Sequence, residues 1–184
     1  MKGRTEAILR ALLAGEGLKS VKRKGWAVKA GVRKPESVAE HSYCVALAAM
    51  LVADASGLDC ARAVKTALLH DLCEAVTGDI QPGEMPVEAK HALERKALKS
   101  VLSGLGPALE KDYLALFDDF NGRRTPEAVA VGELDKLEMA AQALAYERGG
   151  RDLDEFWRTA EGSAATELSR ELLGRLRLMR RRRP

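Results

Sequence analysis

The chain has 184 residues, of which 46% are hydrophobic, and this length and composition suit one globular domain with a substantial core. Its net charge is +3, but the four arginines at residues 180–183 contribute more than that, so the rest of the chain is nearly neutral. A neutral body excludes a broad basic surface for nucleic acid. The tail at residues 180–184 is basic but has no aromatic residue for base stacking, so we interpret it as a solvated chain end.

Membrane and secretory signals are weak in this sequence. The longest apolar stretch, at residues 45–55, is far shorter than the ~18 to 20 residues that cross a bilayer. The first residues lack the uninterrupted apolar core and cleavage site of a signal peptide. Three widely spaced cysteines, an odd number, favour reduced thiols over a disulfide framework. We therefore expect a cytoplasmic protein that has no membrane partner.

Apolar residues recur at spacings of three and four along almost the whole chain, which predicts helices and no strands. The first helix is expected at about residues 5–15. Ser37 and Glu40 form a capping-box pattern, which predicts that the next helix starts here. Asp59 is expected to cap a helix that runs to Leu69. The loop that begins at Gly78 contains two prolines and two glycines beside a cluster of charged residues, and we expect it to form the rim of a pocket.

The second half of the chain is also predicted to be helical. Thr125 and Pro126 mark the start of a helix that ends before Gly149 and Gly150. The connections are too short to separate domains, so we predict an all-α fold with one domain over residues 1–184. The remaining predicted elements are helices at about residues 87–102, 107–118, 152–160 and 164–180, followed by the tail at 180–184.

Polar residues interrupt the apolar helices at a few positions. In "LLHDLCEAVTGDI", His70 and Asp71 end an apolar run, and Glu74 is spaced to share a helical face with them. His41 and Asp135 interrupt two other apolar helices. Buried charges need partners, because leaving them unpaired costs several kcal/mol or more.

A mixed set of imidazoles and carboxylates is typical of a site for a divalent metal. Singly, each residue has a simpler explanation, since a buried histidine can be a core residue and Asp135 can pair with Lys136 or an arginine. Together, two of only three histidines lie on apolar helices, and this favours the metal interpretation. The third, His91, lies on a predicted solvated helical face, and we assign it no function.

The order His41, His70-Asp71, Asp135 resembles the signature of HD-domain metal-dependent phosphohydrolases. The strings "PESVAEHS", "ALLHDLCEAVTGDI" and "ELDKLEMAAQA" resemble the 5′-deoxynucleotidase branch in particular, and the similarity covers about residues 18–148. The resemblance implies a helical bundle and hydrolysis of 2′-deoxyribonucleoside 5′-monophosphates to a deoxynucleoside and phosphate. It also implies that these four residues bind one divalent ion, with Co²⁺ or Mn²⁺ expected and Zn²⁺, Fe²⁺ or Mg²⁺ as alternatives.

The same resemblance assigns roles to further residues. It implies that Glu74 orients the attacking water and that Asp79 protonates the departing 5′ oxygen. A general acid must hold its proton, so we expect a partly buried site for Asp79. By resemblance, Arg23 in "KRKGW" grips the phosphate, with Lys24 as the alternative, and Trp26 packs near the sugar. A half-buried tryptophan that anchors a loop is the simpler interpretation of Trp26.

Other functions remain open at this point. The same site could act on a nucleoside triphosphate, a guanosine polyphosphate or another phosphoester. A non-catalytic helical module with a structural metal and a nucleic-acid-binding tail is the third interpretation. A purely structural metal site has no use for Glu74 and Asp79 beside its ligands, which disfavours that third interpretation. Family resemblance also implies a homodimer.

Overall fold

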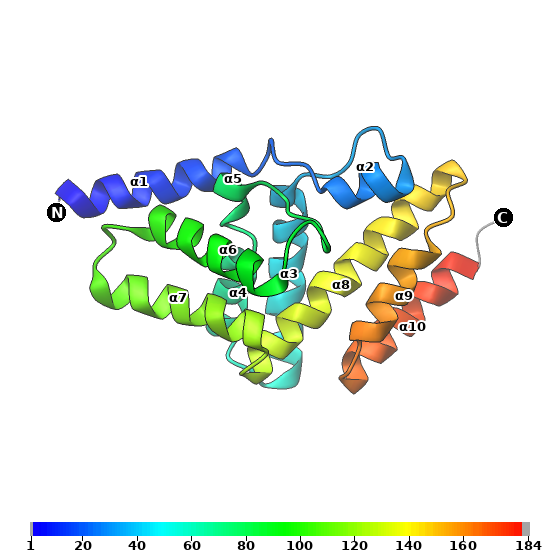
Figure 1. Cartoon of the computed structure of the whole chain (residues 1–184). Helices are drawn as coiled ribbons and strands as arrows, with labels where there is room; N and C mark the ends of the chain where they lie inside the picture. The colour runs from blue at the N-terminus through cyan, green and yellow to red at the C-terminus, as the bar shows by residue number, and fades with distance from the viewer. Residues whose placement is uncertain (1, 182–184) are drawn as a thin grey trace.

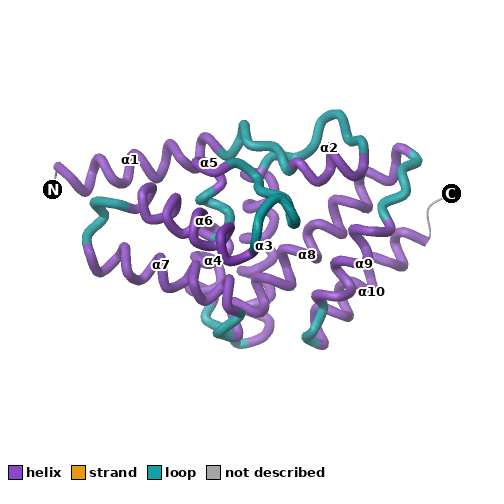
Figure 2. Tube along the Cα trace, in the orientation of Figure 1, coloured by secondary structure: helices purple, strands orange, loops and turns teal. Residues whose placement is uncertain are grey.

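Helices form nearly all the regular structure in residues 2–181, which are the residues that the computed structural model describes (Figure 1). Figure 2 shows them joined by short connections, and the only β pairing within 2–181 is an isolated bridge between Lys22 and Ser37. The all-α prediction is therefore confirmed. In chain order the helices are α1 Lys2–Gly17, α2 Lys24–Ala30, α3 Val38–Ser56, α4 Cys60–Leu69, α5 Glu74–Thr77, α6 Val87–Leu102, α7 Pro107–Gly122, α8 Pro126–Tyr146, the 3₁₀ helix η1 Glu147–Gly149, α9 Asp154–Ser163 and α10 Glu167–Arg181.

The three predicted helix starts are present with the expected capping contacts. The Ser37 side chain accepts a hydrogen bond from the Glu40 backbone N–H, and the Glu40 carboxylate accepts one from the Ser37 N–H. Asp59 caps α4, and Thr125 caps α8 with proline at its first position. These caps satisfy backbone donors that a helix start leaves unpaired, so the beginnings of α3, α4 and α8 are set by local sequence.

The helix that carries His70 ends earlier than the spacing argument assumed. α4 stops at Leu69, and His70 is its C-cap residue. A turn follows, in which the Glu74 N–H donates to the Asp71 carbonyl at 3.0 Å, and Glu74 then begins the short helix α5. One continuous helix from His70 to Glu74 was therefore a wrong prediction. The turn nevertheless keeps these residues beside one pocket.

The short helix α2, Lys24–Ala30, was missed by the sequence prediction. It has only seven residues and contains Gly25, so its intrinsic helix propensity is low. Its stability comes from tertiary packing, because Trp26 is buried and stacks on Phe156 with ring centroids 4.2 Å apart. Such a contact across more than a hundred residues is invisible to local pattern analysis.

The basic tail is partly structured. Arg180 lies in α10, where its guanidinium pairs with Glu147 and Asp154. Its guanidinium carbon also lies 5.1 Å from the centre of the Trp157 ring, a cation–π contact. The interpretation of a solvated end is therefore wrong for Arg180. Arg181, the last residue of α10, is exposed as predicted, and residues 182–184 lie outside the described residues.

Three groups of buried side chains form the core. One joins α1, α4, α6 and α7 around Leu98 and Phe117. A second joins α3, α4 and α8 around Val45 and Val131. A third joins α8 to α9 and α10 around Trp157. Because α8 belongs to two of these groups, it connects the two halves of the molecule, and Figure 1 shows it crossing diagonally between α7 and the α9–α10 pair.

Within residues 2–181, one helix is long and apolar enough to cross a membrane by length and composition alone, namely α3, Val38–Ser56. The segment 45–55 considered from sequence is only part of it. Core helices of soluble proteins meet the same criterion, so it is weak evidence for a membrane span. α3 packs against both α4 and α8, and this packing accounts for the apolar residues on its buried face.

Candidate metal centre and its pocket

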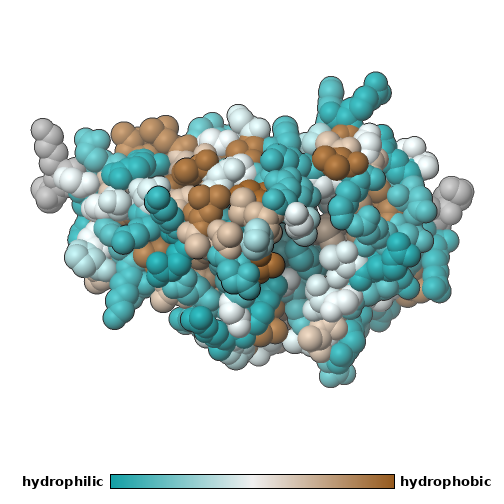
Figure 3. Space-filling model, viewed as in Figure 1, coloured by the Kyte–Doolittle hydropathy of each residue, from teal (hydrophilic) through white to brown (hydrophobic). Residues whose placement is uncertain are grey.

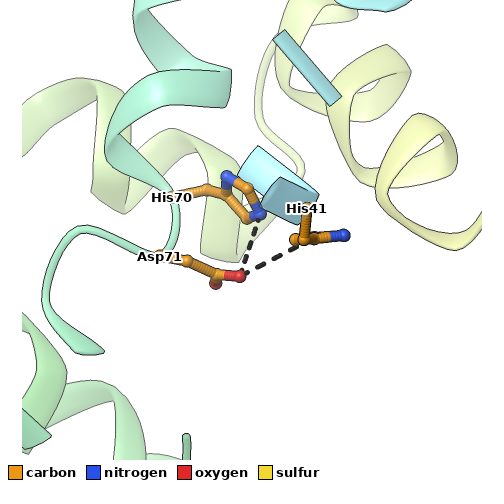
Figure 4. Close-up of side chains that lie close together, drawn as sticks. All are labelled: His41, His70 and Asp71. Carbon is orange, nitrogen blue, oxygen red and sulfur yellow. Dashed lines mark ion pairs between the residues drawn. The ribbon is translucent and has the colours of Figure 1, made fainter. Parts of the chain in front are cut away.

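Two histidines and an aspartate from different parts of the chain meet at the centre of the fold. His41 lies one turn into α3 and is 0% exposed, while His70 and Asp71 follow the end of α4. One ligand atom from each residue lies within 4.8 Å of the other two. Dashed lines in Figure 4 join the Asp71 carboxylate to both imidazoles, and its Oδ2 lies 3.8 Å from His41 Nε2 and 3.2 Å from His70 Nε2.

Asp135 completes the group from α8. Its Oδ1 lies 3.2 Å from His41 Nε2, and its Oδ2 accepts an ion pair from Lys136 Nζ at 2.9 Å. The pairing with Lys136 that the sequence left open is therefore present, and it uses the oxygen that is not next to His41. The four residues predicted as a metal set come together from α3, the end of α4 and α8.

The imidazole nitrogens are arranged as metal ligands require. The Nε2 atoms of His41 and His70 are buried and make no hydrogen bond, although each has a carboxylate oxygen nearby. Their Nδ1 atoms are engaged, His41 with Glu138 Oε2 at 2.5 Å and His70 with the Ala67 carbonyl at 2.6 Å. An Nδ1–H that donates to an oxygen leaves the Nε2 lone pair for a cation. The residues therefore fit a divalent metal ion.

The two carboxylates at this centre are held in their charged form. Burial raises the pKa of Asp71, but His70 and Arg23 outweigh it and hold that pKa well below its usual range. Burial likewise raises the pKa of Asp135, and Lys136 and His41 lower it well below the usual range. Both residues therefore present anionic oxygens at neutral pH.

The charge of His41 depends on the same neighbours. Burial and the Arg23 guanidinium lower the pKa of His41, but the carboxylates of Asp135 and Glu138 raise it to about 9. A metal ion needs the neutral imidazole, so it must displace a proton from this residue when it binds.

A pocket of about 320 Å³ opens beside the four residues. The loop after Gly78 contributes residues 79–82 to its wall, as expected for a pocket rim. Arg23 also lines it, with Nη1 3.3 Å from Asp71 Oδ2 and Nη2 3.8 Å from Asp135 Oδ1. Lys24 is exposed and is absent from the lining, so of the two candidate phosphate-binding cations Arg23 is the one that lines the pocket.

Trp26 is almost fully buried, rather than half-buried as the loop-anchor interpretation assumed. It is 2% exposed, and its Nε1–H donates to Glu36 Oε1 at 2.8 Å. The ring is held between Phe156, stacked at an interplanar angle of 17°, and the edge of Tyr146. It also lines the pocket, so it presents a fixed aromatic surface there.

Glu74 is buried at the start of α5 and faces the pocket. Its Oε2 atom has no hydrogen-bond partner. Burial, together with the carboxylates of Asp71 and Asp79, raises the pKa of Glu74 to about 10. The protein's own groups thus favour a protonated Glu74, and a cation beside Asp71 would act in the opposite direction.

Asp79 is buried in the loop that follows α5, directly after Gly78, whose φ is positive. Its Oδ2 accepts hydrogen bonds from the Lys24 backbone N–H and from the Gln81 side-chain amide, both at 2.6 Å. Burial raises the pKa of Asp79, although the Lys24 N–H lowers it. The side chain therefore has the fixed orientation and buried surroundings that suit a proton donor.

Sequence reasoning missed several residues of this region. Glu138 orients His41, and its spacing of three residues from Asp135 on α8 was the available signal. Gln81 holds Asp79, and Arg123 lines the pocket from the α7–α8 connection. His91 also lines the pocket and is half-buried, a position that its place among charged residues did not indicate. Its side chain reaches the pocket because α6 packs beside α5.

Comparison with known proteins identifies the family. The model of a family described as "HD domain" matches residues 15–173, which is most of the chain. The chain belongs to the HD domain family. The family predicted from the His41, His70-Asp71 and Asp135 pattern is confirmed.

Named relatives of this HD domain are similar over most of their length. The chain is 39% identical to 5′-deoxynucleotidase hdd1 of Schizosaccharomyces pombe over 147 residues, covering 76% of this chain and 73% of that protein. It is 38% identical to 5′-deoxynucleotidase HDDC2 of Mus musculus over 146 residues, covering 79% and 72%. A solved structure of a conserved hypothetical protein from Pyrococcus furiosus superposes with a TM-score of 0.75 at 36% identity, covering 92% of this chain and 98% of that one.

Proposed function

We propose that this HD domain is a 5′-deoxynucleotidase, a phosphoric monoester hydrolase that converts 2′-deoxyribonucleoside 5′-monophosphates to deoxynucleoside and phosphate. The observation that carries the proposal is the presence of two further buried carboxyl groups, Glu74 and Asp79, on the same pocket as the His/Asp cluster. Similarity to proteins named 5′-deoxynucleotidases supports the substrate class.

His41, His70, Asp71 and Asp135 are proposed as the ligands of one divalent ion. Two nitrogens and two carboxylates suit Co²⁺ or Mn²⁺, with Zn²⁺, Fe²⁺ and Mg²⁺ as alternatives. Such an ion supplies a water of lowered pKa and stabilises negative charge on phosphoryl oxygens. The Glu138–His41 and Ala67–His70 hydrogen bonds hold the two rings so that both Nε2 atoms face one point.

Glu74 and Asp79 are proposed to divide the proton transfers. Glu74 in its ionised form accepts a hydrogen bond from the attacking water, and it takes up the proton that this water loses as its oxygen forms the new bond to phosphorus. The bond from phosphorus to the 5′ oxygen breaks, and Asp79 donates its proton to that oxygen. Gln81 and the Lys24 N–H fix Oδ2 of Asp79, so that the other carboxyl oxygen is the one free to carry the proton.

Arg23 and Trp26 are proposed as substrate contacts. Arg23 already lies against Asp71 and Asp135, so a phosphate that it binds is held next to the metal ligands. Trp26 is clamped by Phe156 and by its hydrogen bond to Glu36, so its ring cannot move aside for a larger sugar. A fixed wall of this kind accounts for preference for a sugar without a 2′-hydroxyl.

The test is an assay of phosphate release from matched deoxy and ribo monophosphates, each with Co²⁺, Mn²⁺, Mg²⁺ and Zn²⁺. We expect turnover of the deoxy series with kcat/KM at least about tenfold above the ribo series, because one well-placed steric contact is worth a few kcal/mol. Equal rates for the two series would reject the deoxy assignment. Turnover of only nucleoside triphosphates or guanosine polyphosphates would reject the monophosphatase.

We propose that the protein is a homodimer. Its support is two exposed apolar stripes, one on α1 and one on α3, and Figure 3 shows hydrophobic side chains gathered over the α1 end. The stripes comprise Ile8, Leu9, Leu12 and Leu13 on α1, and Tyr43, Leu47, Met50 and Leu51 on α3.

Light scattering coupled to size-exclusion chromatography should give twice the chain mass. Leu12→Glu tests the α1 stripe and Leu47→Glu tests the α3 stripe. The variant in the stripe that forms the dimer interface should have the mass of one chain, because a buried unpaired carboxylate is costly. A single-chain mass for the unmodified protein at all concentrations would reject the dimer.

We also propose a cytoplasmic location, which the three free cysteines support.

A further inference from the structure

The cationic side chains that line the pocket differ in whether a carboxylate already neutralises them. Four of them pair with acidic side chains: Arg23 with Asp71, Lys29 with Glu155, Lys90 with Glu94, and Lys136 with Asp135. Arg123 lines the same pocket, and within residues 2–181 no carboxylate lies within ion-pair distance of it. A pocket for an anionic substrate therefore contains one cation whose charge is not already matched by a direct partner.

Contacts to backbone and to an aromatic ring hold Arg123 in place. The residue has a left-handed backbone conformation with φ 51°, and its Nη1 donates to the Ala128 carbonyl at 3.0 Å. The guanidinium carbon lies 5.0 Å from the centre of the Phe120 ring, and that ring lies 5.3 Å from the ring of His70. Only one aromatic side chain thus separates the guanidinium from a proposed metal ligand.

Gly132 provides the space for this guanidinium. A Cβ atom at Gly132 would lie 0.8 Å from Arg123 Nη1 and 1.6 Å from its guanidinium carbon. The side chain therefore lies against bare backbone of α8, one turn before Asp135. Glycine inside a helix is less stable than alanine, and the space that it leaves for Arg123 accounts for its presence here.

We propose that Arg123 is a second phosphate-binding residue, which contacts the phosphate of the substrate from the α7–α8 side while Arg23 contacts it from the α2 side. Its planar fork has N–H donors beyond the one bound to Ala128, and these can reach phosphate oxygens in the pocket. This inference rests on the proposed phosphomonoesterase function and adds a residue to its substrate site.

The first test compares Arg123→Ala with Arg124→Ala in the metal-loaded enzyme. Arg124 is the adjacent arginine and is also exposed, but it does not line this pocket. For Arg123→Ala we expect KM to rise by about tenfold to a hundredfold, the usual range for a lost charged hydrogen bond, with kcat within about twofold. The inhibition constant of inorganic phosphate should rise by the same factor. Arg124→Ala should change neither value.

The second test keeps the arginine and fills the space beside Gly132 that its guanidinium occupies. Gly132→Ala should raise KM and the phosphate inhibition constant about as much as Arg123→Ala, because the new Cβ displaces the guanidinium. The double variant should be no worse than either single variant, since both remove the same contact. A melting temperature for each variant reports on folding. If Arg123→Ala lowers only the melting temperature and leaves both constants unchanged, Arg123 is structural and the inference is wrong.

Calorimetry with inorganic phosphate separates this inference from the proposed function. Phosphate binding to the cobalt-loaded protein requires no deoxynucleotide turnover, so a loss of phosphate affinity in Arg123→Ala supports the inference even if deoxy and ribo substrates react equally. Equal phosphate affinity in the wild-type protein, Arg123→Ala and Gly132→Ala would overturn it, whatever substrate the enzyme prefers.

Discussion

Replacing His41 or His70 with alanine should remove the bound divalent metal and lower kcat/KM by more than about a thousandfold, because phosphate monoesters hydrolyse extremely slowly without such assistance. Each imidazole has its Nδ1 engaged and its Nε2 free and buried, so each substitution removes one ligand atom from the centre. Three remaining ligands would bind the ion much more weakly. The measurements are cobalt content after gel filtration, by elemental analysis, and phosphate release from a deoxynucleoside monophosphate.

Two controls make the metal prediction specific. His91→Ala removes a histidine from the same pocket but not from the cluster, and it should retain the metal. Glu138→Gln keeps all ligands and weakens the orientation of His41, so the metal affinity should fall by about tenfold to a hundredfold. Circular dichroism establishes that the variants fold. If His41→Ala and His70→Ala bind cobalt at the wild-type ratio, the proposed ligand set is wrong.

Asp79→Asn should lower kcat by about a hundredfold to ten-thousandfold while the bound metal remains, because the substitution removes a proton donor but no ligand. The side chain is buried and held by the Lys24 N–H and Gln81, so asparagine can occupy the same position. For a substrate whose leaving group needs no proton, such as p-nitrophenyl phosphate, the same substitution should lower kcat much less. Equal losses for both substrates would remove Asp79 from leaving-group protonation.

The pH profile provides an independent check on Asp79. Its pKa is raised, chiefly by burial, so the acid stays protonated to higher pH than an ordinary aspartic acid. Activity should be present below this raised pKa and fall as pH increases through it, since the donor is then lost. Asp79→Asn should abolish this alkaline decline in kcat. An unchanged alkaline decline would assign it to another group.

Much of this protein could be predicted from local sequence. Helix starts at Ser37, Asp59 and Thr125 depend on capping contacts within three residues, and these contacts form wherever the segment goes. The bounds of α6 were predicted correctly at residues 87–102 because its apolar spacing is clear. The proposed ligands were visible as polar residues on apolar helices, since a buried charge without a partner would be too costly to retain.

Only the tertiary structure decided how these residues meet their neighbours. Trp26 stabilises α2 by stacking on Phe156, and Arg123 occupies the space left by Gly132 in α8. The hydrogen bond between Glu138 of α8 and His41 of α3 likewise arises from packing. These contacts join residues on separate helices, and local spacing carries no information on which side chains packing brings together. The sequence alone therefore predicted most of the residues proposed to carry the chemistry, and the packing of α2, α3, α7 and α8 decided what surrounds them.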